Sequence, residues 1–155
     1  MSEEFTRRQL ATALTAFGLP AGFLEAAALP DPNVMTYLLP KDQKWGGDPM
    51  AGANSILLWG DVNLPGPYGQ LVKWQPHNMS RPHFHRGERY IYVISGTWWC
   101  GSGRKYDPDA AYPFPAGTYV RHIANQTHFD GAKDAECVLL MCGIGPAPAV
   151  DNELK

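Results

Sequence analysis

The pattern of apolar and polar residues after residue 30 predicts a series of short β-strands separated by turns. Residues 68–76, YGQLVKWQP, alternate as expected for a strand with one buried face, and residues 89–101, RYIYVISGTWWCG, give the strongest β-strand signal. The chain also has 16 glycines and 14 prolines, spread as turns between strands require. The sequence therefore predicts an all-β sandwich or small barrel. Further strands are expected at residues 34–40, 55–60, 118–124 and 137–143, and loops at 61–69 and 101–115.

The first 30 residues have a helical pattern instead. Leu10, Leu14 and Phe17 fall on one face of a helix predicted over residues 5–17, and residues 21–28 could add a second, short helix. We expect this arm to pack on the domain or on a second subunit. Because the sheet edges also need covering, we expect a homodimer. The predicted organisation is a helical arm over residues 1–30, a barrel domain over 31–147 and a C-terminal tail over 148–155.

Paired arginines leave a second reading of the N-terminus open. Arg7 and Arg8 precede an uncharged stretch and an alanine cluster, which resembles a twin-arginine export signal. Glu25 interrupts the small-residue end of that stretch, which favours a folded arm. We therefore expect a cytoplasmic protein, with a periplasmic location as the alternative.

Composition excludes several classes of protein. The 155 residues are 45% hydrophobic and 18% charged, which is typical of one globular domain. The formal net charge is −2 and no run of lysine or arginine occurs, so neither nucleic acid nor a membrane surface is an expected partner. The three cysteines form no CxxC pair, which argues against a disulfide framework and against a thiolate zinc site.

Two histidines one residue apart are the first candidate site. His83 and His85 project from the same face if residues around them form a strand, because side chains alternate with a period of two. Two adjacent imidazoles suit a first-row divalent metal. An HxH pair alone is a weak signal, since two polar residues can share a strand face without binding a metal.

The surrounding residues resemble the two motifs of the cupin superfamily. HFHRGERYIYVISG matches the first motif, with Gly96 at the expected distance, and GTYVRHIANQTH matches the second, from Gly117 to His128. The resemblance covers about residues 55–145 and is closest to small, single-domain bacterial cupins. It implies a double-stranded β-helix, or jelly-roll barrel, and a metal held by three histidines, His83, His85 and His128.

The chain departs from the first motif at the position of its glutamate. That position holds Arg89, and the acidic residue, Glu88, lies one place earlier. In one reading, a bulge at Gly87 turns Glu88 inward as a fourth ligand. In the other, Arg89 points into the barrel, where a guanidinium cannot bind a metal. The second arrangement keeps the full charge of the metal beside a cation and favours an anionic, chelating ligand.

Three functions follow from this resemblance. The leading expectation is a mononuclear non-haem dioxygenase that uses Fe(II) and acts on a small anionic or enolisable substrate, with Arg89 or Glu88 assisting. The alternatives are a non-oxidative isomerase, lyase or hydrolase, and a non-catalytic metal-binding sensor module. Imidazole ligands also accept Mn, Ni, Cu, Co or Zn, so they do not identify the metal.

Three further polar residues have environments that the sequence helps to predict. His122 is predicted at the surface or behind a ligand histidine, where a hydrogen bond would fix the tautomer of that ligand. Gln70 shares a strand face with Tyr68 and Trp74, and an inward orientation would let its amide reach a metal-bound ligand. His77 is expected in an exposed turn.

Overall fold

The computed structural model describes residues 29–47 and 52–155, which belong to two units, residues 1–39 and 40–155. In the first unit, residues 31–34 form a turn in which the backbone N–H of Asn33 donates to the side chain of Asp31. The predicted strand at 34–40 is wrong, because these residues have no strand partner among the described residues and Pro40–Asp42 forms a short 3-10 helix. The predicted helical arm at residues 5–17 and 21–28 lies outside the described residues. Among the described residues, no helix is long and apolar enough to cross a membrane.

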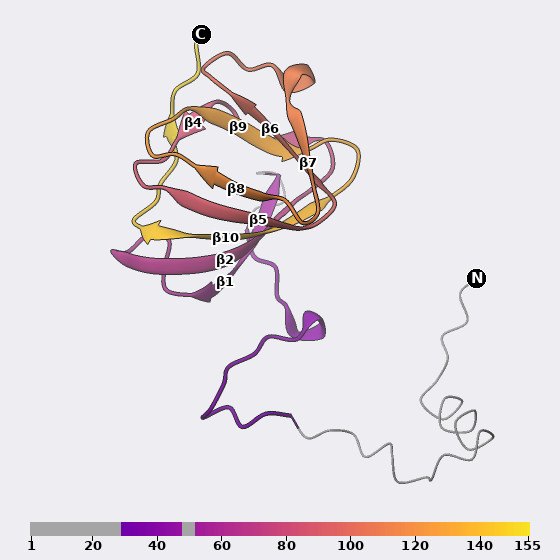
Figure 1. The fold of residues 1–155 in the computed structure, drawn as a ribbon, viewed down its shortest axis with the longest axis vertical. Coiled ribbons are helices and arrows are strands. Elements are labelled where there is room, and N and C mark those ends of the chain that lie inside the picture. The colour runs from indigo at the N-terminus through magenta and orange to yellow at the C-terminus, as the bar shows by residue number, and fades with distance from the viewer. Residues whose placement is uncertain (1–28, 48–51) are drawn as a thin grey trace, which may run out of the picture. The chain divides into compact units, whose positions relative to one another are not determined.

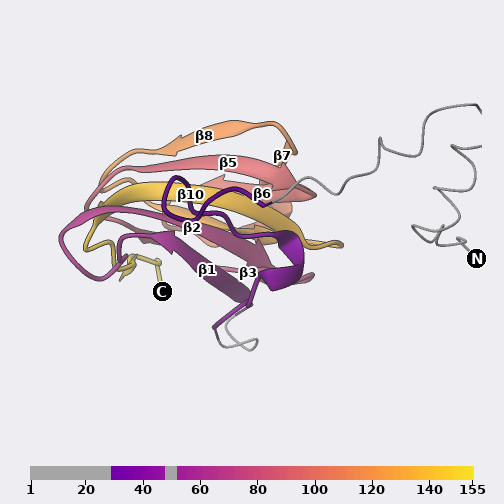
Figure 2. The same ribbon diagram turned by 90° about the horizontal axis from the view of Figure 1, so that it is seen from below.

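Two antiparallel sheets make up the second unit and confirm the predicted double-stranded β-helix (Figure 1). The first sheet has the order β1 (Ala53–Trp59), β2 (Gly66–Trp74), β10 (Cys137–Gly145), β5 (Arg89–Ser95) and β8 (Tyr119–His122). Figure 2 shows these five strands side by side. The second sheet has the order β11 (Val150–Asp151), β4 (His83–Phe84), β9 (His128–Ala132), β6 (Thr97–Ser102) and β7 (Tyr112–Pro115), and β3 (Asn78–Met79) also pairs with β9.

Alternate residues of the first sheet form the core between the two sheets. Inward positions of β2, β5 and β10 are buried while their neighbours are more exposed, as the period of two requires. Trp98 of β6, in the second sheet, is fully buried and packs against the inward residues of the first sheet. The cluster contains Val72, Trp74, Ile91, Val93, Trp98, Ala132, Cys137, Leu139 and Met141.

The strongly patterned segments form strands as predicted. Residues 55–60, 68–76 and 118–124 overlap β1, β2 and β8, residues 137–143 lie within β10, and residues 89–101 cover β5 and all but the last residue of β6. Gly96 makes the tight turn between β5 and β6 with a φ of +74°, and a side chain there would collide with the backbone of Glu136. The short strands β3, β4, β7, β9 and β11 were not predicted, and the loops predicted at 101–115 and 61–69 are wrong where β7 forms and where β2 begins at Gly66. The short strands have two to five residues each, too few for a periodic signal, and cross-strand pairing defines them.

The C-terminal segment is part of the second sheet rather than a tail outside the barrel. Val150 and Asp151 pair with Phe84 and His83 of β4. The side chain of Asn152 donates to Thr127 Oγ1 at 2.6 Å, and its backbone N–H donates to a carbonyl beside β4. The segment therefore braces the strand that carries the first candidate ligand.

Candidate metal centre

The structure brings the three predicted histidine ligands together. His83 on β4 is the direct cross-strand partner of His128 on β9, and His85 follows β4 immediately. The ring centroids of His83 and His128 are 4.6 Å apart, and those of His83 and His85 are 5.0 Å apart. One nitrogen from each of the three rings lies within 4.8 Å of the other two. Histidines 45 residues apart in the sequence thus converge because β4 and β9 are neighbours.

Backbone carbonyls set the tautomer of all three imidazoles. The Nδ1 atoms of His83, His85 and His128 lie 2.8, 3.0 and 3.1 Å from carbonyl oxygens of Arg81, Ala147 and Gln126, respectively. A carbonyl oxygen only accepts, so each Nδ1 carries the proton and each Nε2 keeps a lone pair. The Nε2 atom of His85 is buried and has no hydrogen-bond partner in the described chain. Such orphaned lone pairs fit a first-row divalent metal.

The environment keeps two of these imidazoles neutral. Burial, together with the nearby charge of Arg89, lowers the pKa of His85 to about 3. Burial also lowers the pKa of His128 to about 4, although the carboxylate of Asp130 opposes the shift. At neutral pH both rings are therefore in the form that a metal binds.

Arg89 occupies the centre of the polar cluster. Its side chain is only 8% exposed, and its Nη2 atom lies 3.1 Å from His122 Nδ1 and 3.2 Å from His128 Nε2. Its Nη1 atom donates to Met141 Sδ at 3.4 Å. Burial lowers the pKa of this guanidinium and the carboxylate of Asp130 opposes that shift, but arginine remains a cation. Arg89 thus points inward, as in the second of the two readings.

Glu88 is not brought to the histidines. Its Oε2 atom accepts a hydrogen bond from the hydroxyl of Tyr90 at 3.0 Å, and Arg121 Nε lies 4.0 Å from its Oε1. Tyr90 is exposed, so this contact lies on the outer side of the sheet. The bulge that would have turned Glu88 inward as a ligand or catalytic residue is absent from the described pairing of β5, where Arg89 is in regular register with Gly143 and His122.

Two buried groups lie beside the triad: Asp130, which was not considered from the sequence, and His122, which lies against a candidate ligand histidine rather than at the surface. Asp130 is 4% exposed, and its Oδ2 atom lies 3.7 Å from His128 Nε2. Its position two residues after His128 on β9 puts both side chains on one face, so the period of a strand could have revealed it. His122 is buried with its ring centroid 3.8 Å from that of His128. Burial, together with the neighbouring His128 and Arg89, lowers the pKa of His122 to about 2.

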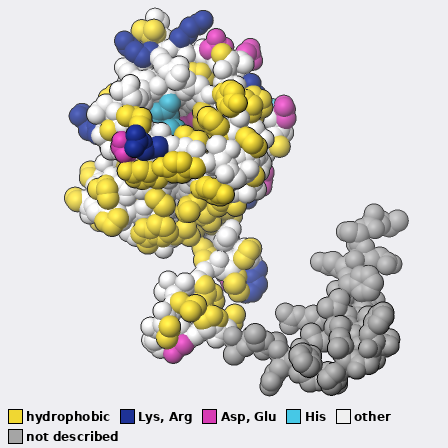
Figure 3. All heavy atoms as spheres, in the orientation of Figure 1, with side chains coloured by type: hydrophobic (Ala, Val, Ile, Leu, Met, Phe, Trp, Pro, Cys, Tyr) yellow, Lys and Arg dark blue, Asp and Glu magenta, His cyan; other side chains and the backbone are white. Residues whose placement is uncertain are grey.

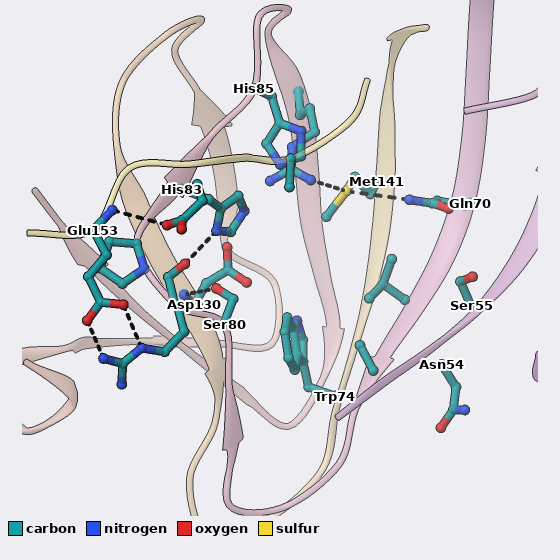
Figure 4. Close-up of a pocket in the computed structure, with 17 residues that line it drawn as sticks. Asn54, Ser55, Gln70, Trp74, Ser80, His83, His85, Asp130, Met141 and Glu153 are labelled. Atoms are coloured by element: carbon teal, nitrogen blue, oxygen red, sulfur yellow. Dashed lines mark hydrogen bonds and ion pairs between the residues drawn. The ribbon is translucent and has the colours of Figure 1, made fainter. Parts of the chain in front are cut away.

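A pocket of about 680 Å³ opens next to these groups. Figure 3 shows histidine atoms within a hollow on this face of the molecule, and Figure 4 shows His83, His85 and Asp130 on the pocket wall together with Gln70 and Trp74. The ion pair between Arg81 and Glu153 lies on another part of the wall. Gln70 lines the pocket, so it has the inward orientation that a contact with a metal-bound ligand would require, and His77 lies in an exposed turn as expected. The pocket is within the range that holds small-molecule ligands.

A two-sheet β-barrel with three convergent histidines at one end is the architecture of a cupin. Residues 34–148 match the model of the ChrR cupin-like domain family, so the chain belongs to that family. A search of curated proteins found no significant match.

Solved structures support the same fold. The polyketide cyclase RemF from Streptomyces resistomycificus superimposes with a TM-score of 0.63 and 18% identity, over 78% of this chain and 87% of that one. KdgF from Halomonas gives a TM-score of 0.54 and 13% identity, over 72% and 94% of the two chains. A sugar phosphate isomerase of the cupin superfamily from Silicibacter pomeroyi gives 0.53 and 20%, over 68% of each chain. At these identities the similarity establishes the fold alone.

Proposed function

We propose that the protein is a metal-dependent cupin enzyme that holds one divalent metal ion through His83, His85 and His128. The observation that carries this proposal is the set of three Nε2 lone pairs, fixed by carbonyl contacts at Nδ1, beside a pocket of about 680 Å³. A metal that serves only structure is usually enclosed by four protein ligands. Three ligands next to an open pocket leave positions for a substrate.

The charges around the site favour a small anionic or enolisable substrate. With the buried imidazoles neutral, the cation of Arg89 and the carboxylate of Asp130 offset each other, and a divalent metal adds two positive charges. A carboxylate or an enolate would reduce this excess charge. Arg89 would then orient the anion, and the apolar side chains of Val72 and Met141 would exclude water from it.

The hydrogen bond between Arg89 and His128 bears directly on this role. His128 Nε2 has one lone pair, which accepts from Arg89 Nη2 in this structure. The same lone pair cannot serve a metal at the same time. A metal ligated by His128 would release that guanidinium nitrogen, while the contact of Arg89 to His122 could remain. The freed donor would be available to an anionic substrate.

The reaction that we propose first is an Fe(II)-dependent dioxygenation. Bound iron would supply Lewis acidity and a redox-active centre for dioxygen chemistry, while the substrate would provide the net electrons. The protein would contribute the neutral imidazole ligands, the orientation of the anion by Arg89 and the apolar wall.

A non-oxidative reaction is the second candidate, and Asp130 is the observation that favours it. This carboxylate lines the pocket, is almost fully buried and lies beside His128, where it could accept a proton from a substrate carbon or hydroxyl. Such a role suits an isomerase, lyase or hydrolase. Two structurally similar proteins are described as a polyketide cyclase and a sugar phosphate isomerase, which are also non-oxidative activities.

Metal content is the first test of both candidates. The protein is purified without chelator or added metal and compared with His83→Ala by elemental analysis. We expect about one equivalent of metal per chain in the wild-type protein and a loss of that metal in the variant. Dioxygen uptake by iron-loaded protein with enolisable and carboxylate compounds then separates the first candidate from the second. A non-catalytic sensor module would bind metal but turn over none of these compounds. Absence of metal from both proteins, with unchanged stability, would overturn the proposed metal site.

A further inference from the structure

Two hydrogen-bond donors in the pocket share one poor acceptor. Arg89 Nη1 donates to Met141 Sδ at 3.4 Å, and Gln70 Nε2 donates to the same sulfur at 3.8 Å. A thioether accepts hydrogen bonds only weakly. The Nε atom of Arg89 is buried and has no partner among the described residues. Buried donors normally have hydrogen-bond partners. A ligand with oxygen acceptors would therefore satisfy these donors better than the thioether of the protein does.

The strand register places the two donors close to each other in the barrel. Met141 of β10 is the direct partner of Gln70 on β2 and of Ile91 on β5, two residues after Arg89. The guanidinium and the amide therefore reach the sulfur from the strands on either side of β10. A ligand with two oxygen atoms on one face, such as a carboxylate or an enolate, can accept from both.

The pocket continues from these donors along an apolar wall. Gln70, Val72 and Trp74 are alternate inward residues of β2, and all three line the pocket (Figure 4). Four residues of β-strand span about 13 Å. Acetate would fill only the polar end of such a space. The flat indole of Trp74 at the far end offers a surface suited to a ring, since offset stacking adds to the burial of apolar area.

We propose that this pocket binds a ring-bearing oxyanion, either an aromatic carboxylate or an aryl-substituted enolate. Its oxygen atoms accept hydrogen bonds from Arg89 and Gln70, and its ring lies along Val72 toward Trp74. The inference rests on the proposed function in placing the substrate in the same pocket. Protein side chains, rather than a bound metal, make the contacts of this inference. Ligand binding can therefore be measured without turnover.

The probe is 2-naphthoate, titrated into metal-free protein and into protein loaded with redox-inactive zinc. Acetate, which has no ring, and 2-naphthylmethanol, which has no negative charge, are the matched ligands. We expect 2-naphthoate to bind at least about tenfold more tightly than either, because only it uses both ends of the pocket. Zinc should tighten binding further, because it adds positive charge. Equal affinity for acetate would overturn the ring site, and equal affinity for 2-naphthylmethanol would overturn the oxyanion site.

Substitution of Gln70 tests the hydrogen-bonding end. Gln70→Leu should weaken 2-naphthoate binding about tenfold and leave 2-naphthylmethanol almost unchanged, because a hydrogen bond to a charged ligand is lost. Gln43→Leu is the matched control, since Gln43 lies outside the pocket. Unchanged binding of 2-naphthoate to folded Gln70→Leu protein would overturn the role of the amide.

Tryptophan fluorescence tests the ring end without removing the aromatic side chain. Quenching by 2-naphthoate should fall in Trp74→Phe and persist in Trp45→Phe, because Trp74 lines the pocket and Trp45 does not. Equal quenching in the two variants would place the ring elsewhere and overturn the proposal.

These results are separable from those for the proposed function. Metal-bearing, active protein that fails to bind 2-naphthoate would overturn this inference alone. Metal-free protein that binds 2-naphthoate through Gln70, but takes up no metal under any loading condition, would support this inference and overturn the metal-dependent activity.

Discussion

Arg89 lies directly opposite His122 in the pairing of β5 with β8, and one guanidinium nitrogen contacts both His122 and His128. A cation thus occupies the position where the cupin motif has a carboxylate. It donates to the lone pair of one of the three candidate ligands, so metal binding at His128 would be coupled to the conformation of Arg89.

Replacing Arg89 should strengthen metal binding and weaken anion binding. Arg89→Met removes a buried cation and frees His128 Nε2, so we expect about a tenfold gain in zinc affinity. Competition with a chromophoric chelator measures this change. Arg121→Met, on the exposed face of β8, is the control and should have little effect. A lower zinc affinity in folded Arg89→Met protein would contradict the coupling.

Asp130 should contribute to stability through the charge that it places near Arg89. Asp130→Asn keeps the shape of the side chain but leaves the buried guanidinium without a nearby anion, so the free energy of unfolding should fall by about 2 kcal/mol. Urea denaturation measures the change. The exposed Asp134→Asn should lie within about 0.5 kcal/mol of the wild-type protein. An Asp130→Asn protein as stable as that control would show that Asp130 does not compensate Arg89.

The metal-free protein should lose stability as the pH falls below about 6.5. The folded-state pKa values of His85 and His128 are about 3 and about 4, below the ordinary value of 6.5. Between these values the unfolded chain binds protons that the folded chain does not, so acid favours unfolding. Urea denaturation between pH 7 and pH 4 should show this decline.

Single substitutions can assign the pH dependence to the site. His85→Gln should reduce the decline, because it removes one of three histidines with a lowered pKa and leaves His122 and His128. His77→Gln should leave it unchanged, since His77 is exposed. Identical pH profiles for wild-type and His85→Gln proteins would show that His85 is not held neutral by the fold.

The C-terminal segment should increase metal affinity by pairing with β4, the strand that carries His83. Deletion of residues 149–155 removes the pairing of β11 with β4 but keeps the carbonyl of Ala147 that receives His85 Nδ1–H. We expect zinc affinity to fall about tenfold, since the candidate ligand His83 loses its partner on β11 and keeps only its pairing with β9. Glu153→Gln, which breaks only a surface ion pair with Arg81, should change affinity little. Equal affinities in the deletion and this control would exclude a bracing role.

Local pattern predicted the long strands, and resemblance to a known family predicted the three candidate ligands. The alternation in β2 and the dense β-forming run of β5 and β6 are properties of neighbouring residues, so they can be read without the fold. His83, His85 and His128 were found because their spacing resembles two family motifs. The period of a strand could also have identified Asp130, because it lies two residues after His128 on the same strand.

Tertiary structure decided which residues surround those ligands. His122 approaches Arg89 only because β5 pairs with β8, and the carbonyl of Ala147 reaches His85 from 62 residues away. The choice between Glu88 and Arg89 depended on the register of β5, since a shift of one residue would reverse every side chain. Periodicity shows which residues of one strand share a face. Pairing between strands that are distant in the sequence determines which faces meet in the barrel and which segment covers the site.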